Sequence, residues 1–288
     1  MEYSDYPLSS WTLRKVRMMD FCPRGALLHY VHARAGADPE APAEVHYLHT
    51  LKCRISRRDY RSRLVRGLLR EYFRLDPELQ TPADEVDLYP MLVNRFEKEY
   101  ISMLTGSSSV SARHPVLMEL YEPDCRTAWL ASEIKTALAD IVSALNKTIL
   151  PLLHRLPPEN KRHLPTVLET HINELTCYFS PLFIFENNGE LWFVEEGIRD
   201  ERVAVLHKFY ALNVLGWHPE RVKSFCADLV TGGFEQFGIA ADISQALRDI
   251  TEDCARWEEL RDLPLEMVQI KEKNCNKCKF REFCRQGT

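Results

Sequence analysis

An apolar residue recurs every four positions from Tyr60 to Tyr72, which is the spacing of one face of an α-helix. Similar patterns predict further helices, and loops rich in Pro, Gly or Ser separate them. The predicted helices span residues 9–28, 57–73, 83–104 and 127–149, and the loops span 35–43 and 106–115. We therefore expect residues 1–160 to form a mainly helical part.

The pattern changes after Pro157-Pro158, where β-prone runs join the helical segments. An Asn-Gly pair at 188–189 lies between two such runs, at 178–185 and 191–195, which is typical of a β-hairpin. A helix at 165–175 precedes the hairpin, and a helix at 202–215, a strand at 221–230 and a helix at 242–261 follow it. This order predicts an α/β (α+β) core over residues 161–262, with a central mixed sheet flanked by helices.

The composition is that of a globular protein, with 45% hydrophobic and 27% charged residues. A net charge of -5 excludes a uniformly basic nucleic-acid-binding protein. No apolar run approaches the roughly 20 residues that a membrane-spanning helix needs, and the N-terminus lacks a signal-peptide pattern. We expect a cytoplasmic protein without a membrane partner, in which thiols stay reduced.

Three cysteines in the C-terminal segment 263–288 have the spacing of metal ligands. Cys275, Cys278 and Cys284 form a Cys-x2-Cys-x5-Cys pattern. Three thiolates leave a four-ligand site incomplete, and Cys22 is the best-placed fourth ligand. Such a site would join the two ends of the chain.

The asymmetry of this pattern favours a four-iron, four-sulfide (4Fe-4S) cluster over zinc. Structural zinc sites usually pair two close Cys-x2-Cys knuckles. This chain has one knuckle and a distant fourth cysteine, and an iron–sulfur cluster can take its ligands from distant segments. Zinc is the alternative.

Two N-terminal motifs, Ser10-Trp11-Thr12-Leu13 and Cys22-Pro23-Arg24, accompany the terminal cysteine spacing. With it, they resemble iron–sulfur nucleases of the RecB-like PD-(D/E)xK superfamily, such as CRISPR-associated RecB-like exonucleases and AddAB-type nuclease domains. The resemblance covers most of the chain but is loose in the middle. It implies one domain of 288 residues with a restriction-endonuclease-like core. In that family an iron–sulfur cluster links the two ends of a domain that binds single-stranded DNA.

The resemblance also locates the family's catalytic positions in this chain. The family has a metal-binding Asp where this chain has Phe183, and a Glu-x-Lys motif where it has Glu195 followed by Gly197. Hydrolysis needs acidic ligands for a divalent metal and a lysine beside it. Two of these three positions do not match, so we expect a nuclease fold without hydrolytic activity.

A rearranged active site is the alternative to lost activity. Its candidate residues are Lys208 as a relocated lysine and, as metal ligands, Glu169, Glu186, Glu195 and His49. Such a site would bind Mg²⁺ or Mn²⁺ and make the protein a metal-dependent DNA exonuclease.

Residues 52–74 are rich in arginine, whereas the chain as a whole is acidic. An apolar stripe runs through this segment, so its arginines should share the opposite face of the helix. Arginine suits bidentate phosphate contacts and stacking on bases. The candidate nucleic-acid-binding residues are Arg57, Arg58, Arg61, Arg63, Arg66 and Arg70. A solvated helix face and an acidic protein partner are the alternatives.

Together these features predict a cluster-bearing, catalytically inactive RecB-like protein. It would bind DNA, in single-stranded form, or act as a scaffold beside a helicase or nuclease partner subunit in antiviral defence or DNA repair. A redox or iron-sensing subunit is a third hypothesis. The sequence has no P-loop and no Gly-x-Ser-x-Gly elbow, which argues against an ATPase and an α/β-hydrolase.

Overall fold

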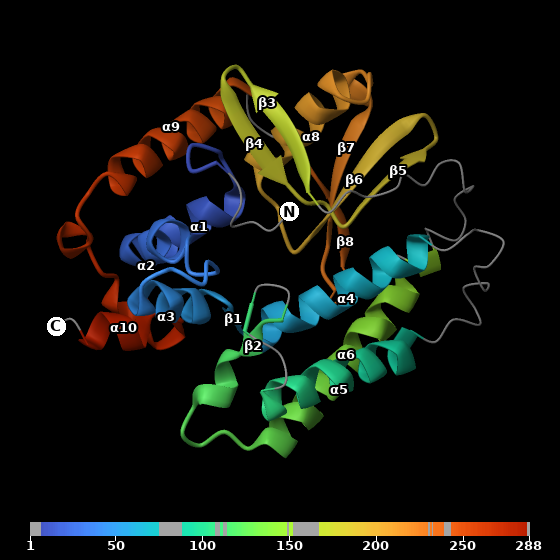
Figure 1. The fold of residues 1–288 in the computed structure, drawn as a ribbon. Helices are drawn as coiled ribbons and strands as arrows, with labels where there is room; N and C mark the ends of the chain where they lie inside the picture. The colour runs from blue at the N-terminus through green and yellow to red at the C-terminus, as the bar shows by residue number, and fades with distance from the viewer. Residues whose placement is uncertain are drawn as a thin grey trace.

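The computed structural model combines helices with small sheets (Figure 1). It describes residues 7–74, 88–106, 110–111, 114–148, 150–151, 167–229, 231, 233–238 and 243–286. The predicted mixed α/β architecture is confirmed at this coarse level. Among the described residues, no helix has the length and apolar character needed to cross a membrane.

The predicted helix at 9–28 is broken at Cys22. Helix α1 (Leu13–Phe21) begins at Thr12, whose hydroxyl accepts a hydrogen bond from the backbone N–H of Lys15 (3.1 Å). Cys22 is extended, with φ -164° and ψ 112°, because a residue before proline is disfavoured in the helical region. Pro23 then starts α2 (Pro23–Leu27), which continues into a π-helical turn, η1 (Leu28–His32). The break therefore avoids a clash between Pro23 and a continuing helix, and it places Cys22 at the junction of two helices.

Two short elements that the sequence did not predict precede the basic helix. Helix α3 (Ala43–Lys52) follows the 35–43 loop, and β1 (Arg54–Ile55) pairs in parallel with β2 (Val116–Leu117). A 3-10 turn, η4 (Met118–Tyr121), follows β2.

Three long helices form the predicted helical part. They are α4 (Arg57–Arg74), α5 (Leu88–Thr105) and α6 (Thr127–Lys147). These three predictions are confirmed, although residues 83–87 and 149 lie outside the described residues. Tyr60, Leu64 and Leu68 are buried, as the four-residue spacing requires.

Residues 168–179 form a hairpin, so the predicted helix at 165–175 is wrong where the structure describes it. Strands β3 (Leu168–Ile172) and β4 (Leu175–Phe179) are antiparallel, and Asn173 takes a φ of +54° in the turn. Alternate residues of β3 are buried, which is the two-residue period of a strand. This two-residue alternation is visible in the sequence as Leu-Glu-Thr-His-Ile at 168–172.

The main sheet has the order β5-β6-β7-β8 and is mixed, as predicted. Its strands are β5 (Phe183–Asn187), β6 (Glu190–Glu196), β7 (Val222–Ala227) and β8 (Phe234–Phe237). The β5–β6 hairpin turns at Asn188-Gly189, both with positive φ, which confirms the Asn-Gly prediction. Helix α8 (Glu201–Asn213) connects β6 to its parallel neighbour β7. Strand β8 was not predicted.

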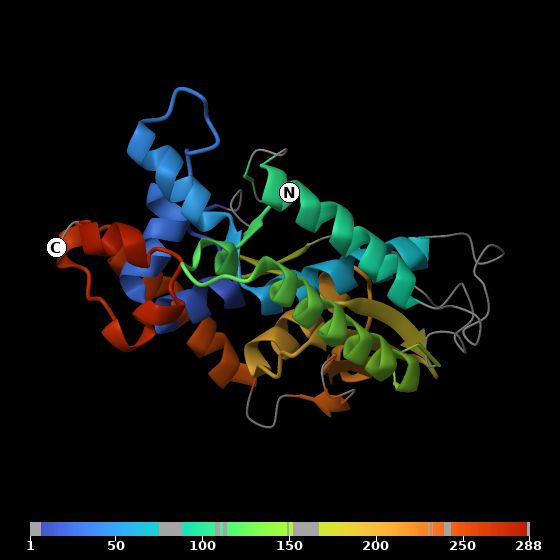
Figure 2. The same cartoon turned by 90° about the horizontal axis from the view of Figure 1, so that it is seen from below.

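The C-terminal segment returns to the N-terminal helices. After α9 (Ile243–Arg261) come two 3-10 turns, η7 (Leu265–Met267) and η8 (Glu272–Lys277), and then α10 (Arg281–Gln286). Figures 1 and 2 both show this segment beside α2 and α3. Phe280 is buried there against Leu28, Leu48 and Leu51.

Candidate functional site

The four candidate ligand cysteines lie where the two ends of the chain meet. Cys22 occupies the junction between α1 and α2. Cys275 lies in η8, Cys278 follows η8 directly, and Cys284 lies in α10. Cys22 is buried, whereas the other three are half-buried.

Side-chain hydrogen bonds hold the C-terminal segment against this junction. Lys271 Nζ donates to the carbonyl of Asp20 (2.7 Å), and Asn274 Nδ2 donates to the carbonyl of Phe21. From the other side, Arg24 donates through Nε (3.0 Å) and Nη2 (2.9 Å) to the carbonyl of Leu265. The backbone on both sides of Cys22 is therefore tied to the segment that carries the other three cysteines.

Gly25 leaves space next to two of the thiols. A Cβ atom at this position would lie 3.8 Å from Cys22 Sγ and 3.8 Å from Cys278 Sγ. Gly25 is itself buried in α2. Any larger side chain would therefore project toward the space that the sulfur atoms border.

The four thiols are close enough to interact electrostatically. Burial raises the pKa of Cys278 to about 11, and the thiols of Cys22, Cys284 and Cys275 contribute to the rise. Burial also raises the pKa of Cys284, with further contributions from Cys22 and Cys275, while the Arg24 guanidinium lowers it. Because their neighbours disfavour ionisation of Cys278 and Cys284, a cationic centre beside these two thiols would favour their ionised forms.

In the part of the chain that the structure describes, no three His, Cys, Asp or Glu side chains have the geometry to hold a metal ion. A single zinc ion requires its ligands to converge on one point. A four-iron cluster does not, since each thiolate binds a different iron atom. Neighbouring thiols that do not meet at a point are thus compatible with a cluster.

The acidic residue that matches the family's catalytic position is enclosed in the core. Glu195 on β6 is 1% exposed, and its Oε1 accepts a hydrogen bond from His207 Nε2 on α8 (3.1 Å). With Nε2 protonated, the Ser224 hydroxyl on β7 donates to His207 Nδ1 (2.8 Å). Phe193 stacks on the imidazole at 4.5 Å. His207 and Ser224 were not predicted as site residues, although both lie at buried positions of their elements.

The two positions where the nuclease resemblance would place an aspartate and a lysine also have structural roles here. Phe183 is 4% exposed and pairs with Val194 in the sheet. Gly197 has a φ of +61°, in the left-handed region where lysine is strained. These positions therefore supply neither a carboxylate nor an amine.

Helix α4 places a positive charge at this end of the sheet. Arg66 Nη2 lies 3.2 Å from Glu196 Oε2, and Arg66 Nη1 donates to the carbonyl of Ser180 (2.8 Å). The Ser62 hydroxyl donates to the other Glu196 oxygen (2.5 Å). A guanidinium thus bridges the last residue of β6 and the segment that leads into β5.

The residues proposed for a rearranged active site belong to separate elements. Exposed Glu169 on β3 pairs with His171 (3.2 Å), and Glu186 lies near the far end of β5. His49 on α3 contacts Cys53 Sγ through Nε2 (3.5 Å), and Lys208 is half-buried on α8. The described residues contain no metal-binding group that would unite them.

Of the five candidate DNA-binding arginines whose side chains the structure describes, three face carboxylates. Arg57 pairs with Glu133, Arg63 lies 3.9 Å from Glu99, and Arg66 pairs with Glu196 as described. Arg58 is exposed, and Arg61 is half-buried. Burial lowers the pKa of Arg61. The nearby Glu133 opposes this shift by raising the pKa, whereas Arg57 and Arg58 lower it further. The side chain of Arg70 lies outside the described residues.

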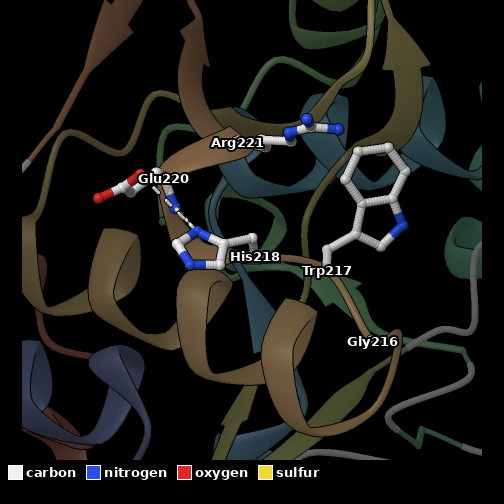
Figure 3. Close-up of a pocket in the computed structure, with 5 residues that line it drawn as sticks. All are labelled: Gly216, Trp217, His218, Glu220 and Arg221. Carbon is white, nitrogen blue, oxygen red and sulfur yellow. Dashed lines mark hydrogen bonds and ion pairs between the residues drawn. The ribbon is translucent and has the colours of Figure 1, made fainter.

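A separate hollow lies between α8 and β7 (Figure 3). Its lining residues are Gly216, Trp217, His218, Glu220 and Arg221. His218 Nδ1 accepts a hydrogen bond from the backbone N–H of Glu220 (3.4 Å). None of the residues predicted from the sequence lines it.

No protein-family model matches the chain, and a search of curated proteins finds no match. The functional argument therefore rests on the fold and on the geometry described above.

Proposed function

We propose that the chain is an iron–sulfur protein with a RecB-like nuclease fold that has lost its hydrolytic centre. In this proposal it binds single-stranded DNA and serves as a non-catalytic subunit beside a helicase or nuclease. The observation that carries the proposal is that Cys22 and Cys278, from the two ends of the chain, meet beside Gly25, with Cys275 and Cys284 near enough to Cys278 to interact electrostatically.

The donor set supports a cluster. Cys22, Cys275, Cys278 and Cys284 would hold it, and a bound cluster would cross-link the two ends of the domain. Arg24 interacts electrostatically with Cys284 and would offset part of the negative charge of the thiolates. Gly25 keeps the adjacent space clear of side-chain atoms.

The sheet supports the loss of hydrolysis. Metal-dependent cleavage needs carboxylates that reach the substrate, but Glu195 is buried and bonded to His207. Glu196 at the strand end is instead neutralised by Arg66. The guanidinium supplies the positive charge there without the coordination chemistry of a metal.

Iron and acid-labile sulfide analysis of anaerobically purified protein tests the cluster. We expect about four iron atoms and four sulfides per chain, with broad visible absorbance. Cys278→Ser should lose most of both, whereas the matched variant Cys125→Ser, at a half-buried cysteine outside the site, should retain them. One equivalent of zinc without sulfide would overturn the cluster.

A cleavage assay with single-stranded DNA and Mg²⁺ or Mn²⁺ tests the loss of hydrolysis. We expect binding without cleavage. Metal-dependent cleavage that is abolished by Glu195→Gln would instead establish the rearranged exonuclease. A partner affinity that changes with the reduction state of the cluster would favour the redox or iron-sensing subunit.

A further inference from the structure

Two aromatic side chains are widely exposed near the start of the basic helix α4. Trp129 in the first turn of α6 is 59% exposed, and Tyr121 at the end of η4 is 44% exposed. Trp129 is the most exposed of the five tryptophans, and all five lie in the described part of the chain. Large apolar rings left in solvent commonly mark contact surfaces.

An arginine lies against each of these rings. Arg54 Cζ is 3.7 Å from the centre of the Tyr121 ring, and Arg57 Cζ is 5.9 Å from that of the Trp129 ring. Each guanidinium is also paired with a carboxylate, so each arginine is held beside its ring. The carboxylates are those of Glu282 for Arg54 and Glu133 for Arg57.

Two exposed arginines lie close in the chain to Arg57 and Trp129. Arg58 follows Arg57 in the first turn of α4, and Arg126 is the N-cap of α6. Neither is ion-paired with a described residue, and the guanidinium group suits contact with phosphate oxygens. Glu122 and Asp124 are exposed between η4 and α6, so this surface is not uniformly basic. Binding here should therefore depend more on stacking than on charge.

We infer that Tyr121 and Trp129, with Arg54, Arg57, Arg58 and Arg126, form a stacking patch that binds the unpaired bases of single-stranded DNA. The inference rests on the proposed DNA-binding function and assigns it to a surface. Every base presents a π-face, so recognition by the stacking patch is tolerant of sequence. Bases in a duplex are stacked on each other and leave the two rings without a partner.

Binding of a short oligothymidylate to the full-length protein, followed by fluorescence anisotropy and tryptophan quenching, tests the stacking patch. Trp129→Ala and Tyr121→Ala should each weaken binding by roughly tenfold or more. Trp129→Phe should restore part of the affinity and remove most of the quenching. The control is Ile101→Ala on α5, at a side chain that is 60% exposed, and it should bind as the wild type does.

The outcomes separate the stacking patch from DNA binding in general. If the wild type binds and both alanine variants bind equally well, the stacking patch is overturned. DNA binding would then belong to another surface, and a protein contact would be favoured here. No binding by the wild type would overturn both proposals. Duplex DNA that binds as tightly as the single strand, or a steep salt dependence without an effect of the ring variants, would also overturn the role of stacking.

Discussion

Glu195 shows how one residue type can match a catalytic motif and still have a structural role. Its carboxylate is 1% exposed and accepts from His207, whose other ring nitrogen bonds Ser224. Buried polar atoms contribute to stability only when each has a partner. Because three different elements supply these partners, the network fixes α8 against β6 and β7.

We therefore expect Glu195→Ala to lower the free energy of unfolding by roughly 1–3 kcal/mol, since His207 Nε2 would lose its buried acceptor. Urea denaturation followed by circular dichroism measures the change. Glu259→Ala, on the exposed face of α9, should stay within about 0.5 kcal/mol of the wild type. Equal stability of both variants would show that the network does not hold these elements together.

At the scale of elements, the backbone directly after β6 disfavours the lysine that the nuclease resemblance would place there. Gly197 takes a φ of +61°, which a residue with a Cβ adopts only with strain. A lysine at position 197 would therefore need a different backbone conformation as well as a different residue.

Gly197→Lys should consequently destabilise the protein by about 1 kcal/mol without restoring cleavage. Gly238→Lys is a matched control, because a Cβ there meets no atom within 4 Å and the φ is not in the left-handed region. Thermal unfolding compares the two variants, and a nuclease assay with Mn²⁺ checks activity. Cleavage by Gly197→Lys would contradict the loss of the metal ligands.

The same elements show what the sequence could and could not predict. Long amphipathic helices such as α4 and the Asn188-Gly189 hairpin were predicted, because their signals are local. The break at Cys22 was missed although Pro23 signals it, and β3 was missed because its alternation is only five residues long. The ion pair between Arg66 and Glu196 spans 130 positions, and no local pattern indicates it.

At the scale of the whole molecule, the C-terminal segment packs against the N-terminal helices and so brings the two ends of the chain together. Phe280 is 1% exposed and packs against Leu28, Leu48 and Leu51. The cysteine spacing predicted that the ends would meet, but no local pattern indicated this small apolar cluster. The contact between the ends therefore includes apolar packing that does not depend on a metal.

Phe280→Ala should lower the free energy of unfolding by roughly 3–5 kcal/mol, because it leaves a cavity between the two ends. It should also reduce the iron retained during purification. Met267→Ala, at a side chain that is 70% exposed, should change neither quantity. Denaturant titration and iron analysis of the same preparations provide the comparison, and wild-type stability of Phe280→Ala would mean that the ends do not pack in this way.

The meeting of the chain ends also determines when the protein can complete its fold during synthesis. Asn274 bonds the carbonyl of Phe21 across 253 positions. At roughly 5–20 residues per second, a ribosome takes about 13–50 s to add the residues between them. During that time the apolar surface around Leu28, Leu48 and Leu51 is not yet covered by Phe280 and is accessible to chaperones. A nascent chain that stops short of Phe280 would keep this apolar surface exposed.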